Sequence, residues 1–245
     1  MSNRLSGPGT ASWKALVNVL PEFEVDPGRT ALVIIDMTKQ QASRDHGFCQ
    51  RLIERGFTDD LAYYLDRIGN TVIPAIQRLT AAFHEVGAPV TYTRCVSLRG
   101  DGSDQTWRHR HIGVITTLDA EISEFVPGLE PIDGDIVLNK TGSSVFNSTN
   151  FEHLLRNMGM TTVVVTGIYT NSCVEGTIRD AGDLDFRVLM AEDACAAMSA
   201  IGHENSIDYL DGNFCHARSA DEIVALMRSG GAERSRDPFR EQVPA

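Results

Sequence analysis

The 245-residue sequence lacks the features of membrane proteins and of secreted proteins held together by disulfides. Its longest apolar runs, such as residues 31–35, have the length of a strand, whereas a membrane-spanning helix needs about 18 apolar residues. The first 16 residues contain no continuous apolar segment of the kind found in a signal peptide. Five cysteines, an odd number without a Cys-x-x-Cys pair, favour free thiols in a reducing compartment. We therefore expect a cytoplasmic protein that does not bind membranes.

Positive charge is also scarce. The chain has 22 Lys and Arg residues against 33 Asp and Glu residues, which gives a net charge of −11. Proteins that bind a phosphate backbone normally carry the opposite excess, so we expect no nucleic-acid partner. No Gly-x-Gly-x-x-Gly motif follows the first apolar run, which argues against a nucleotide-binding module.

What the chain does contain is an alternation of apolar segments with amphipathic ones. An almost unbroken apolar run over residues 30–35 ends at Asp36, as expected of a strand buried on both faces of a parallel sheet. The pattern predicts a three-layer α/β/α fold with a mostly parallel six-stranded sheet and helices on both faces. The other predicted strands are 89–93, 135–139, 161–166, 187–191 and 214–217. The predicted helices are 72–86, one capped by Ser148 or by Thr149 with Glu152, 173–183, 199–210 and 219–227.

One domain accounts for most of the chain. Residues 29–228 carry the alternating pattern, residues 1–28 are predicted to form an irregular arm along the core or a neighbouring subunit, and residues 229–245 form a polar tail. Residues 94–134 show no strong periodicity. We expect them to form a long functional loop with one short helix near 119–125.

Three predicted strand ends each deliver one reactive side chain. Asp36 follows the first strand, Lys140 follows the third and Cys173 lies just beyond the fourth. Because the carboxyl ends of parallel strands meet at one edge of a sheet, these groups are expected to converge. The backbone N–H groups at the start of a helix beginning at Cys173, together with the Lys140 ammonium, would favour the thiolate over the thiol. Asp36 would accept the thiol proton.

Three sequence segments resemble one enzyme superfamily. They are Ala31-Leu-Val-Ile-Ile-Asp36-Met37, Lys140-Thr-Gly-Ser-Ser-Val-Phe146-Asn-Ser-Thr149-Asn-Phe151 and Thr166-Gly-Ile-Tyr-Thr-Asn-Ser-Cys173-Val-Glu-Gly-Thr-Ile-Arg-Asp-Ala181. In this order and spacing, over about residues 29–228, the chain resembles the isochorismatase-like cysteine hydrolases. That superfamily includes nicotinamidase, N-carbamoylsarcosine amidase, ureidoacrylate and biuret hydrolases, and maleamate amidase.

The resemblance implies a catalytic triad of Asp36, Lys140 and Cys173. It also implies a cis peptide bond between Ile168 and Tyr169, which would place the N–H of Tyr169 beside that of Cys173 as an oxyanion hole. Members that hydrolyse isochorismate lack the nucleophilic cysteine, so Cys173 argues against vinyl-ether cleavage.

Two departures from family patterns bear on the substrate. The chain has Met37-Thr-Lys-Gln-Gln41 where family members commonly have Met-Gln-x-Asp-Phe, so the pocket wall near the first strand is atypical. The Asp-x-His metal ligands of nicotinamidases are absent after the second strand. His109 and His111 alternate with arginines and would make a poor metal site, so we expect neither a metal nor another cofactor.

We expect the substrate to be a small linear ureido or carbamoyl amide. Planar arginines in the loop suit carbonyl-rich or anionic ligands, and Trp107 offers a flat surface for a ureido group. The predicted substrate contacts are Trp107, Arg108, Phe146 and Asn171. The loop over 94–111 has an alternative role as a subunit contact, in keeping with an expected homo-oligomer, a dimer or a tetramer.

Other functions fit the same fold. One is deamidation of a maleamate-type or nicotinamide-type amide, and another is a thiol sensor or binding module without turnover. The complete set of Asp36, Lys140 and Cys173 favours a cysteine amidohydrolase that acts through a covalent thioester-type intermediate.

Overall fold

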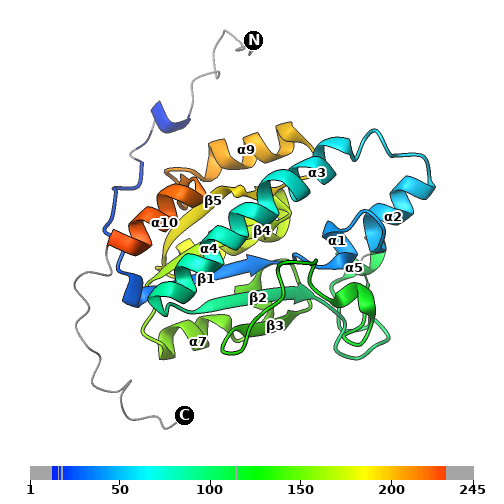
Figure 1. The fold of residues 1–245 in the computed structure, drawn as a ribbon, viewed down its shortest axis with the longest axis horizontal. Helices are drawn as coiled ribbons and strands as arrows, with labels where there is room; N and C mark the ends of the chain where they lie inside the picture. Colours follow the sequence, from blue (N-terminus) through cyan, green and yellow to red (C-terminus); the bar gives the residue numbers. More distant parts are fainter. Residues whose placement is uncertain (1–12, 16, 18, 114, 230–245) are drawn as a thin grey trace.

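The predicted apolar segments form one six-stranded sheet, in which every strand is parallel to its neighbours (Figure 1). The computed structural model describes residues 13–15, 17, 19–113 and 115–229. Across the sheet the order is β3-β2-β1-β4-β5-β6. The predicted α/β/α fold is confirmed, and the sheet is wholly parallel. The strands are β1 (Thr30–Ile35), β2 (Val90–Cys95), β3 (Ile136–Lys140), β4 (Thr162–Ile168), β5 (Arg187–Ala196) and β6 (His216–Arg218).

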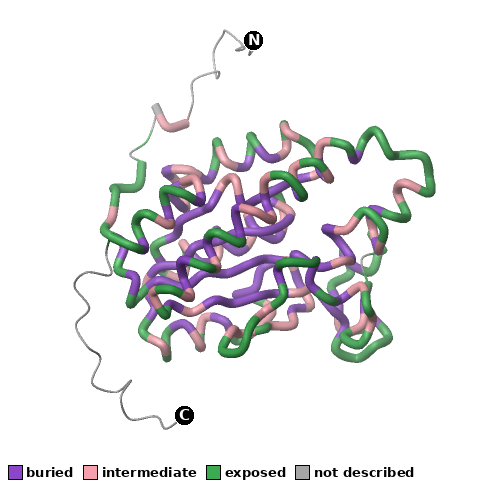
Figure 2. The backbone as a smooth tube through the Cα atoms, in the orientation of Figure 1, coloured by how far each residue is buried: buried purple, intermediate pink, exposed green. Residues whose placement is uncertain are grey.

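Helices cover both faces of the sheet, and alternate residues of β1 point to the two sides. Leu32 and Ile34 pack with α3, α4 and α10, whereas Ala31, Val33 and Ile35 pack with α6, α7 and α8. Figure 2 shows the strands as the most continuously buried part of the chain. The helices are α1 (Lys39–Ala42), α2 (Gly47–Glu54), α3 (Ala62–Arg67), α4 (Ile73–Val86), α5 (Trp107–Ile112), α6 (Val145–Ser148), α7 (Phe151–Asn157), α8 (Glu175–Asp183), α9 (Ala200–Leu210) and α10 (Ala220–Ser229).

The strand order reverses direction at β1. The chain moves outward through β2 and β3 on one side of β1 and through β4, β5 and β6 on the other. In open α/β sheets, ligands bind beyond the carboxyl ends of the strands at such a reversal. Asp36 leaves β1 at this point, with β2 and β4 on either side.

Several predicted boundaries need correction. The fifth strand was expected to end at Ala191 before two acids, but β5 continues to Ala196 because neighbouring elements bind those acids' polar groups. The Asp193 carboxylate accepts a hydrogen bond from the N–H of Ala220, and the Glu192 carbonyl accepts one from Arg67. A short helix, α5, also lies within the predicted loop of residues 94–134, and near 119–125 there is only a 3-10 turn, Glu121–Ser123.

Two helix ends follow the predicted capping chemistry, and a third does not. Gly87 ends α4 in the left-handed conformation that its position predicts. Ser219 and Glu222 form the expected capping box at the start of α10. The capping box proposed for Thr149 and Glu152 is wrong, because Thr149 ends α6 and its hydroxyl accepts from the N–H of Phe151 instead.

The described part of the N-terminal arm lies along α9 and the loop after it. The Trp13 indole N–H donates to the carbonyl of Asp208, and Lys14 pairs with Asp211 at 2.8 Å. The N–H of Leu20 donates to the carbonyl of Gly212. The arm therefore contacts its own core; the tail beyond Ser229 lies outside the described residues. In the described ranges no helix has both the length and the apolar character needed to cross a bilayer.

Candidate active site

Asp36 is the first residue after β1, and the sheet edge fixes its side chain. Its backbone has φ = 56°, a left-handed conformation that only a few residue types adopt readily. The N–H of Asp36 donates to the carbonyl of Thr93 in β2, and the Thr93 hydroxyl donates to the Asp36 carboxylate at 3.2 Å. The side chain is completely buried. The carboxylate therefore has a defined orientation away from solvent.

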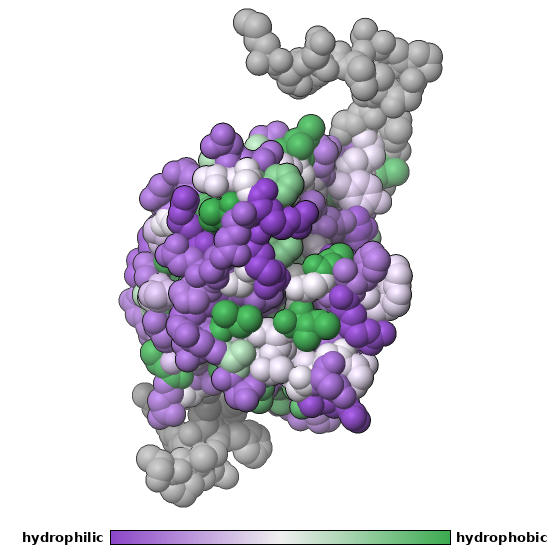
Figure 3. All heavy atoms as spheres, turned by 90° about the vertical axis from the view of Figure 1, so that its right-hand side faces the viewer, coloured by the Kyte–Doolittle hydropathy of each residue, from purple (hydrophilic) through white to green (hydrophobic). Residues whose placement is uncertain are grey.

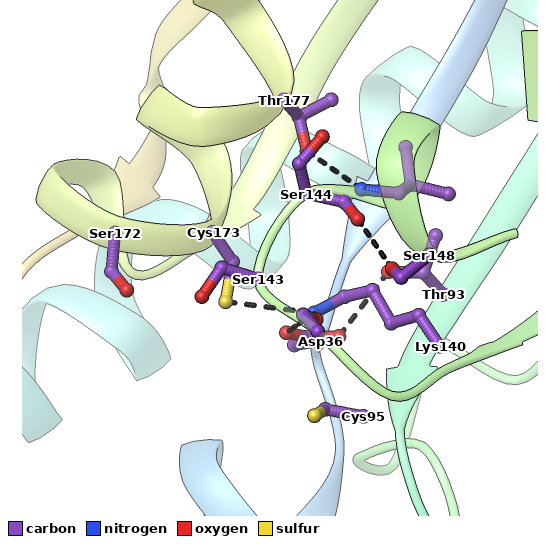
Figure 4. A network of polar contacts seen from close by, with 12 residues as sticks. Asp36, Thr93, Cys95, Lys140, Ser143, Ser144, Ser148, Ser172, Cys173 and Thr177 are labelled. Carbon is purple, nitrogen blue, oxygen red and sulfur yellow. Dashed lines mark hydrogen bonds and ion pairs between the residues drawn. The ribbon is translucent and has the colours of Figure 1, made fainter. Parts of the chain in front are cut away.

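Lys140, the last residue of β3, forms a buried ion pair with this carboxylate. Its Nζ lies 2.7 Å from Asp36 Oδ2, 3.0 Å from the carbonyl oxygen of Gly142 and 3.5 Å from Cys173 Sγ (Figure 4). These three acceptors match the three N–H bonds of an ammonium group. Burial alone would lower the pKa of Lys140, but the negative groups around it, Asp36 first, raise the pKa above its ordinary value. This environment favours the charged, ammonium form of Lys140.

Cys173 completes the cluster from the turn η5 (Thr170–Val174), which joins β4 to α8. Only 4% of the residue is exposed. Burial raises the pKa of its thiol; Lys140 lowers the pKa, and Asp36 raises it through its charge and a hydrogen bond. The expectation that Lys140 and the helix start would favour a resting thiolate is not met, because desolvation outweighs them. The raised pKa favours the neutral thiol, which lies beside the Asp36 carboxylate.

The end of β4 brings the turn η5 close to Asp36. Gly167 pairs with Ile35 in the sheet and has φ = 105°. A Cβ at Gly167 would lie 2.1 Å from the carbonyl oxygen of Ile35, so no other residue fits this crossing. The peptide bond between Ile168 and Tyr169 is cis, as the family resemblance predicted. The main chain then turns directly into η5 and reaches Cys173.

Arg108 on α5 spans the two loops that flank Cys173. Its Nη1 donates to Ser143 Oγ at 3.0 Å, and its Nη2 donates to Ser172 Oγ at 3.0 Å. His109 Nε2 lies 3.1 Å from Nη1. Arg108 forms no ion pair with a carboxylate of the described residues. Its guanidinium instead contacts two serine hydroxyls and an imidazole.

This geometry agrees with the comparisons to known proteins. The isochorismatase domain model matches residues 30–222, which include Asp36, Lys140 and Cys173. The chain belongs to the isochorismatase family. The resemblance drawn from the three sequence motifs is thereby confirmed.

Relatives of this isochorismatase-family protein include named amidohydrolases. A ureidoacrylate amidohydrolase from Pseudomonas syringae pv. syringae is 32% identical over 226 residues, which cover 85% of this chain and 88% of that protein. An N-carbamoylsarcosine amidase from Arthrobacter sp. is 29% identical over 163 residues, or 64% of this chain and 61% of that protein. The crystal structure of a cysteine hydrolase from Pseudomonas syringae pv. phaseolicola superimposes with a TM-score of 0.74 at 25% identity, over 87% of this chain and 98% of that one.

The other predicted contact residues of the isochorismatase-family site lie in different surroundings. Trp107 is 71% exposed and stacks on His111, with ring centroids 5.1 Å apart. Phe146 is buried against Phe151 and Phe186, in the core face that also contains Cys173. Asn171 is exposed on η5. Of the four, Arg108 is the one with hydrogen bonds to both Ser143 and Ser172, on either side of Cys173.

The two candidate metal-binding histidines do not point to one site. His109 is buried, with Nδ1 3.8 Å from Cys95 Sγ, whereas His111 is exposed beside Trp107. In the described part of the chain no group of three or more His, Cys, Asp and Glu side chains is arranged to hold a metal ion.

The face at which the strands end carries several exposed apolar side chains among polar ones (Figure 3). The segments that follow β1 and β2 contain exposed apolar residues, among them Phe57, Leu98, Trp107, Ile112 and Leu118. Asp36, Lys140 and Cys173 are buried.

Sequence reasoning missed two polar groups at the site. Thr93 was part of a predicted strand with no assigned role, yet its hydroxyl orients Asp36. His109 was considered only as a metal ligand, whereas its ring contacts Arg108 and Cys95. The position of Thr93, a polar residue near the end of a predicted strand, is a signal that could have indicated its contact with Asp36. No local sequence pattern indicates the contact between His109 and Cys95.

Proposed function

We propose that this protein is a cysteine-dependent amidohydrolase that cleaves the C–N bond of a small linear ureido or carbamoyl compound. The observation that carries the proposal is the buried cluster of Asp36, Lys140 and Cys173. The Lys140 ammonium lies 2.7 Å from the Asp36 carboxylate and 3.5 Å from the Cys173 sulfur. Burying an ion pair costs desolvation energy, so the pair between Asp36 and Lys140 need not stabilise the fold. Its position beside a thiol therefore favours a catalytic role.

In the first half of the reaction, Cys173 Sγ attacks the carbonyl carbon while its proton passes to the Asp36 carboxylate. The carbonyl electrons move to the oxygen, which receives hydrogen bonds from the N–H groups of Tyr169 and Cys173. When the carbonyl re-forms, the C–N bond breaks and Asp36 gives its proton to the leaving amine or ammonia. The product is a thioester or thiocarbamate on Cys173.

In the second half, water restores the enzyme. Asp36 takes one proton of the water as its oxygen adds to the acyl carbon, and the C–S bond then breaks. The proton on Asp36 returns to Cys173 Sγ, so the resting thiol and carboxylate are regenerated. Throughout, Lys140 keeps its proton, because three acceptors, one of them the negatively charged Asp36, stabilise the cation.

Arg108 supports a substrate that carries a carboxylate beyond the scissile bond. The guanidinium is bound to two serine hydroxyls and an imidazole, and a carboxylate can replace these neutral partners with stronger, charge-assisted hydrogen bonds. Ureidoacrylate and N-carbamoylsarcosine, named for two relatives, both contain a carboxylate. In this proposal Asn171 lines the exposed side of the pocket, Trp107 borders its entrance, and Phe146 supports it from within the core.

Replacing Arg108 by glutamine is expected to raise KM for carboxylated ureido substrates about 10- to 100-fold, the loss of a charged hydrogen-bonded pair. The value of kcat/KM for biuret, which has no carboxylate, should change little. Steady-state ammonia release would be measured for both, together with maleamate and nicotinamide. Arg110→Gln is the matched control, because Arg110 lies on the same helix but binds the carbonyl groups of Ser103 and Gln105.

Two outcomes would contradict the substrate assignment. If nicotinamide gave the highest kcat/KM in the wild-type protein and ureido compounds were inert, the ureido class would be wrong. Equal loss of activity on biuret and on carboxylated substrates in Arg108→Gln would assign Arg108 a structural role only.

A further inference from the structure

A buried chain of hydrogen bonds lies behind the turn that carries the nucleophile. Arg67 at the end of α3 places Nη2 2.8 Å from Nε2 of His203 on α9. The other ring nitrogen, Nδ1, lies 2.8 Å from Oγ1 of Thr170, the first residue of η5. His203 and Thr170 are both buried. Residues far apart in the sequence thus meet directly behind Tyr169 and Cys173.

The guanidinium group of Arg67 determines which atoms donate and which accept in these hydrogen bonds. A guanidinium only donates, so Nε2 of His203 accepts from Arg67 and the ring proton belongs to Nδ1. The Nδ1–H then donates to Thr170 Oγ1. A protonated His203 would offer Arg67 a donor in place of an acceptor, which the 2.8 Å contact does not allow. The ring is therefore the neutral Nδ1–H tautomer.

Charge around His203 supports the same state. Burial, together with the positive charge of Arg67, lowers the pKa of His203 to about 4. The remaining bonds of Arg67 run to the carbonyl groups of Glu192 and Cys195, and no described carboxylate lies within ion-pair distance of it. The imidazole thus faces an uncompensated cation.

We propose that Arg67, His203 and Thr170 are positioning residues for the oxyanion hole. Thr170 directly follows Tyr169, so the hydrogen bond from His203 fixes the main chain between the two N–H groups that would hold the oxyanion. Arg67 fixes His203 in turn and joins it to the carbonyl groups of β5. The inference rests on the proposed amidohydrolase function, and none of the three side chains contacts the thiol.

Close packing explains why α9 can act on the turn. Gly202 precedes His203, and a Cβ there would lie 3.1 Å from Nδ2 of Asn171. The first turn of α9 therefore lies close to η5 at this point. Because His203 binds Thr170, we infer that displacing His203 would shift the N–H groups of Tyr169 and Cys173 relative to each other.

Thr170→Val and Thr170→Ser form the matched test. Valine keeps the shape of threonine but cannot accept from Nδ1–H, and we expect kcat on a carbamoyl substrate to fall about 10- to 100-fold with KM changed less than about threefold. Serine keeps the acceptor and should stay within about threefold of wild-type kcat. Should Thr170→Val fail to fold, the pair His203→Asn and His203→Leu replaces it, because asparagine keeps an N–H near the position of Nδ1.

A second readout is independent of turnover. The nitrogen-15 spectrum of wild-type protein, with the His203 signal assigned from its loss in His203→Asn, should show a neutral Nδ1–H ring at neutral pH. An Nε2–H or charged ring would overturn the inference, and so would wild-type kcat in Thr170→Val. If wild-type protein hydrolysed no amide at all, the proposed function would be wrong. The tautomer of His203 would still show whether the hydrogen bonds from Arg67 to His203 and from His203 to Thr170 exist.

Discussion

Replacing Cys173 by serine is expected to lower kcat by about four orders of magnitude or more. The serine hydroxyl has a far higher pKa than a thiol, and this buried site raises the pKa of an acidic group further, as it does for Cys173. Asp36 can take a proton from a thiol but cannot generate a comparable fraction of alkoxide. Ammonia release under saturating substrate would give kcat, and thermal unfolding would verify the fold.

Cys215→Ser provides the matched control for this experiment. Cys215 is buried in the same core face and, like Cys173, has a pKa raised mainly by burial, but it contacts neither Asp36 nor Lys140 in the structure. Its substitution should leave kcat unchanged. Cys173→Ser protein that folds and retains more than about a tenth of wild-type kcat would exclude Cys173 as the nucleophile.

Asp36→Asn is expected to lower kcat by about three orders of magnitude or more, since one group serves as both base and acid. Asparagine tolerates the φ of 56° at this position, so the main chain should be preserved. The amide cannot accept the Cys173 proton, and it has no proton to give to the leaving amine. Single-turnover kinetics would show the loss in the step that forms the acyl-enzyme.

The same substitution has a separate effect on stability. It leaves the buried Lys140 cation without its carboxylate, which costs about 3 kcal/mol or more of the free energy of unfolding. Adding Lys140→Met removes the charge and should restore much of that stability. The double variant must remain inactive if Asp36 is the base; recovered turnover in it would contradict the proposed mechanism.

The meeting of Asp36, Lys140 and Cys173 could be predicted because each stands at, or just beyond, the end of an apolar segment. The run over 30–35 ends at Asp36, and the parallel fold brings such ends to one edge whatever their separation in sequence. Burial was harder to anticipate: the sequence places Lys140 near Cys173, but it does not show that desolvation would outweigh the lysine's effect on the thiol pKa.

Short helices and long-range polar contacts escaped prediction for other reasons. The helices α1, α2 and α3 have four, eight and six residues, too few turns for a periodic apolar pattern. The hydrogen bond between Arg67 and His203 joins residues 136 positions apart. Its existence depends on how α3 and α9 pack, and no local property of either helix indicates it.

The central claim, covalent catalysis by Cys173, is tested most directly by rapid-quench mass spectrometry. Wild-type protein mixed with excess carbamoyl substrate and quenched within one turnover should gain the mass of the acyl or carbamoyl group, on the peptide that contains Cys173. Cys173→Ser protein should show no such adduct. Product formed in the first turnover without an adduct, or an adduct on a peptide lacking Cys173, would contradict the mechanism.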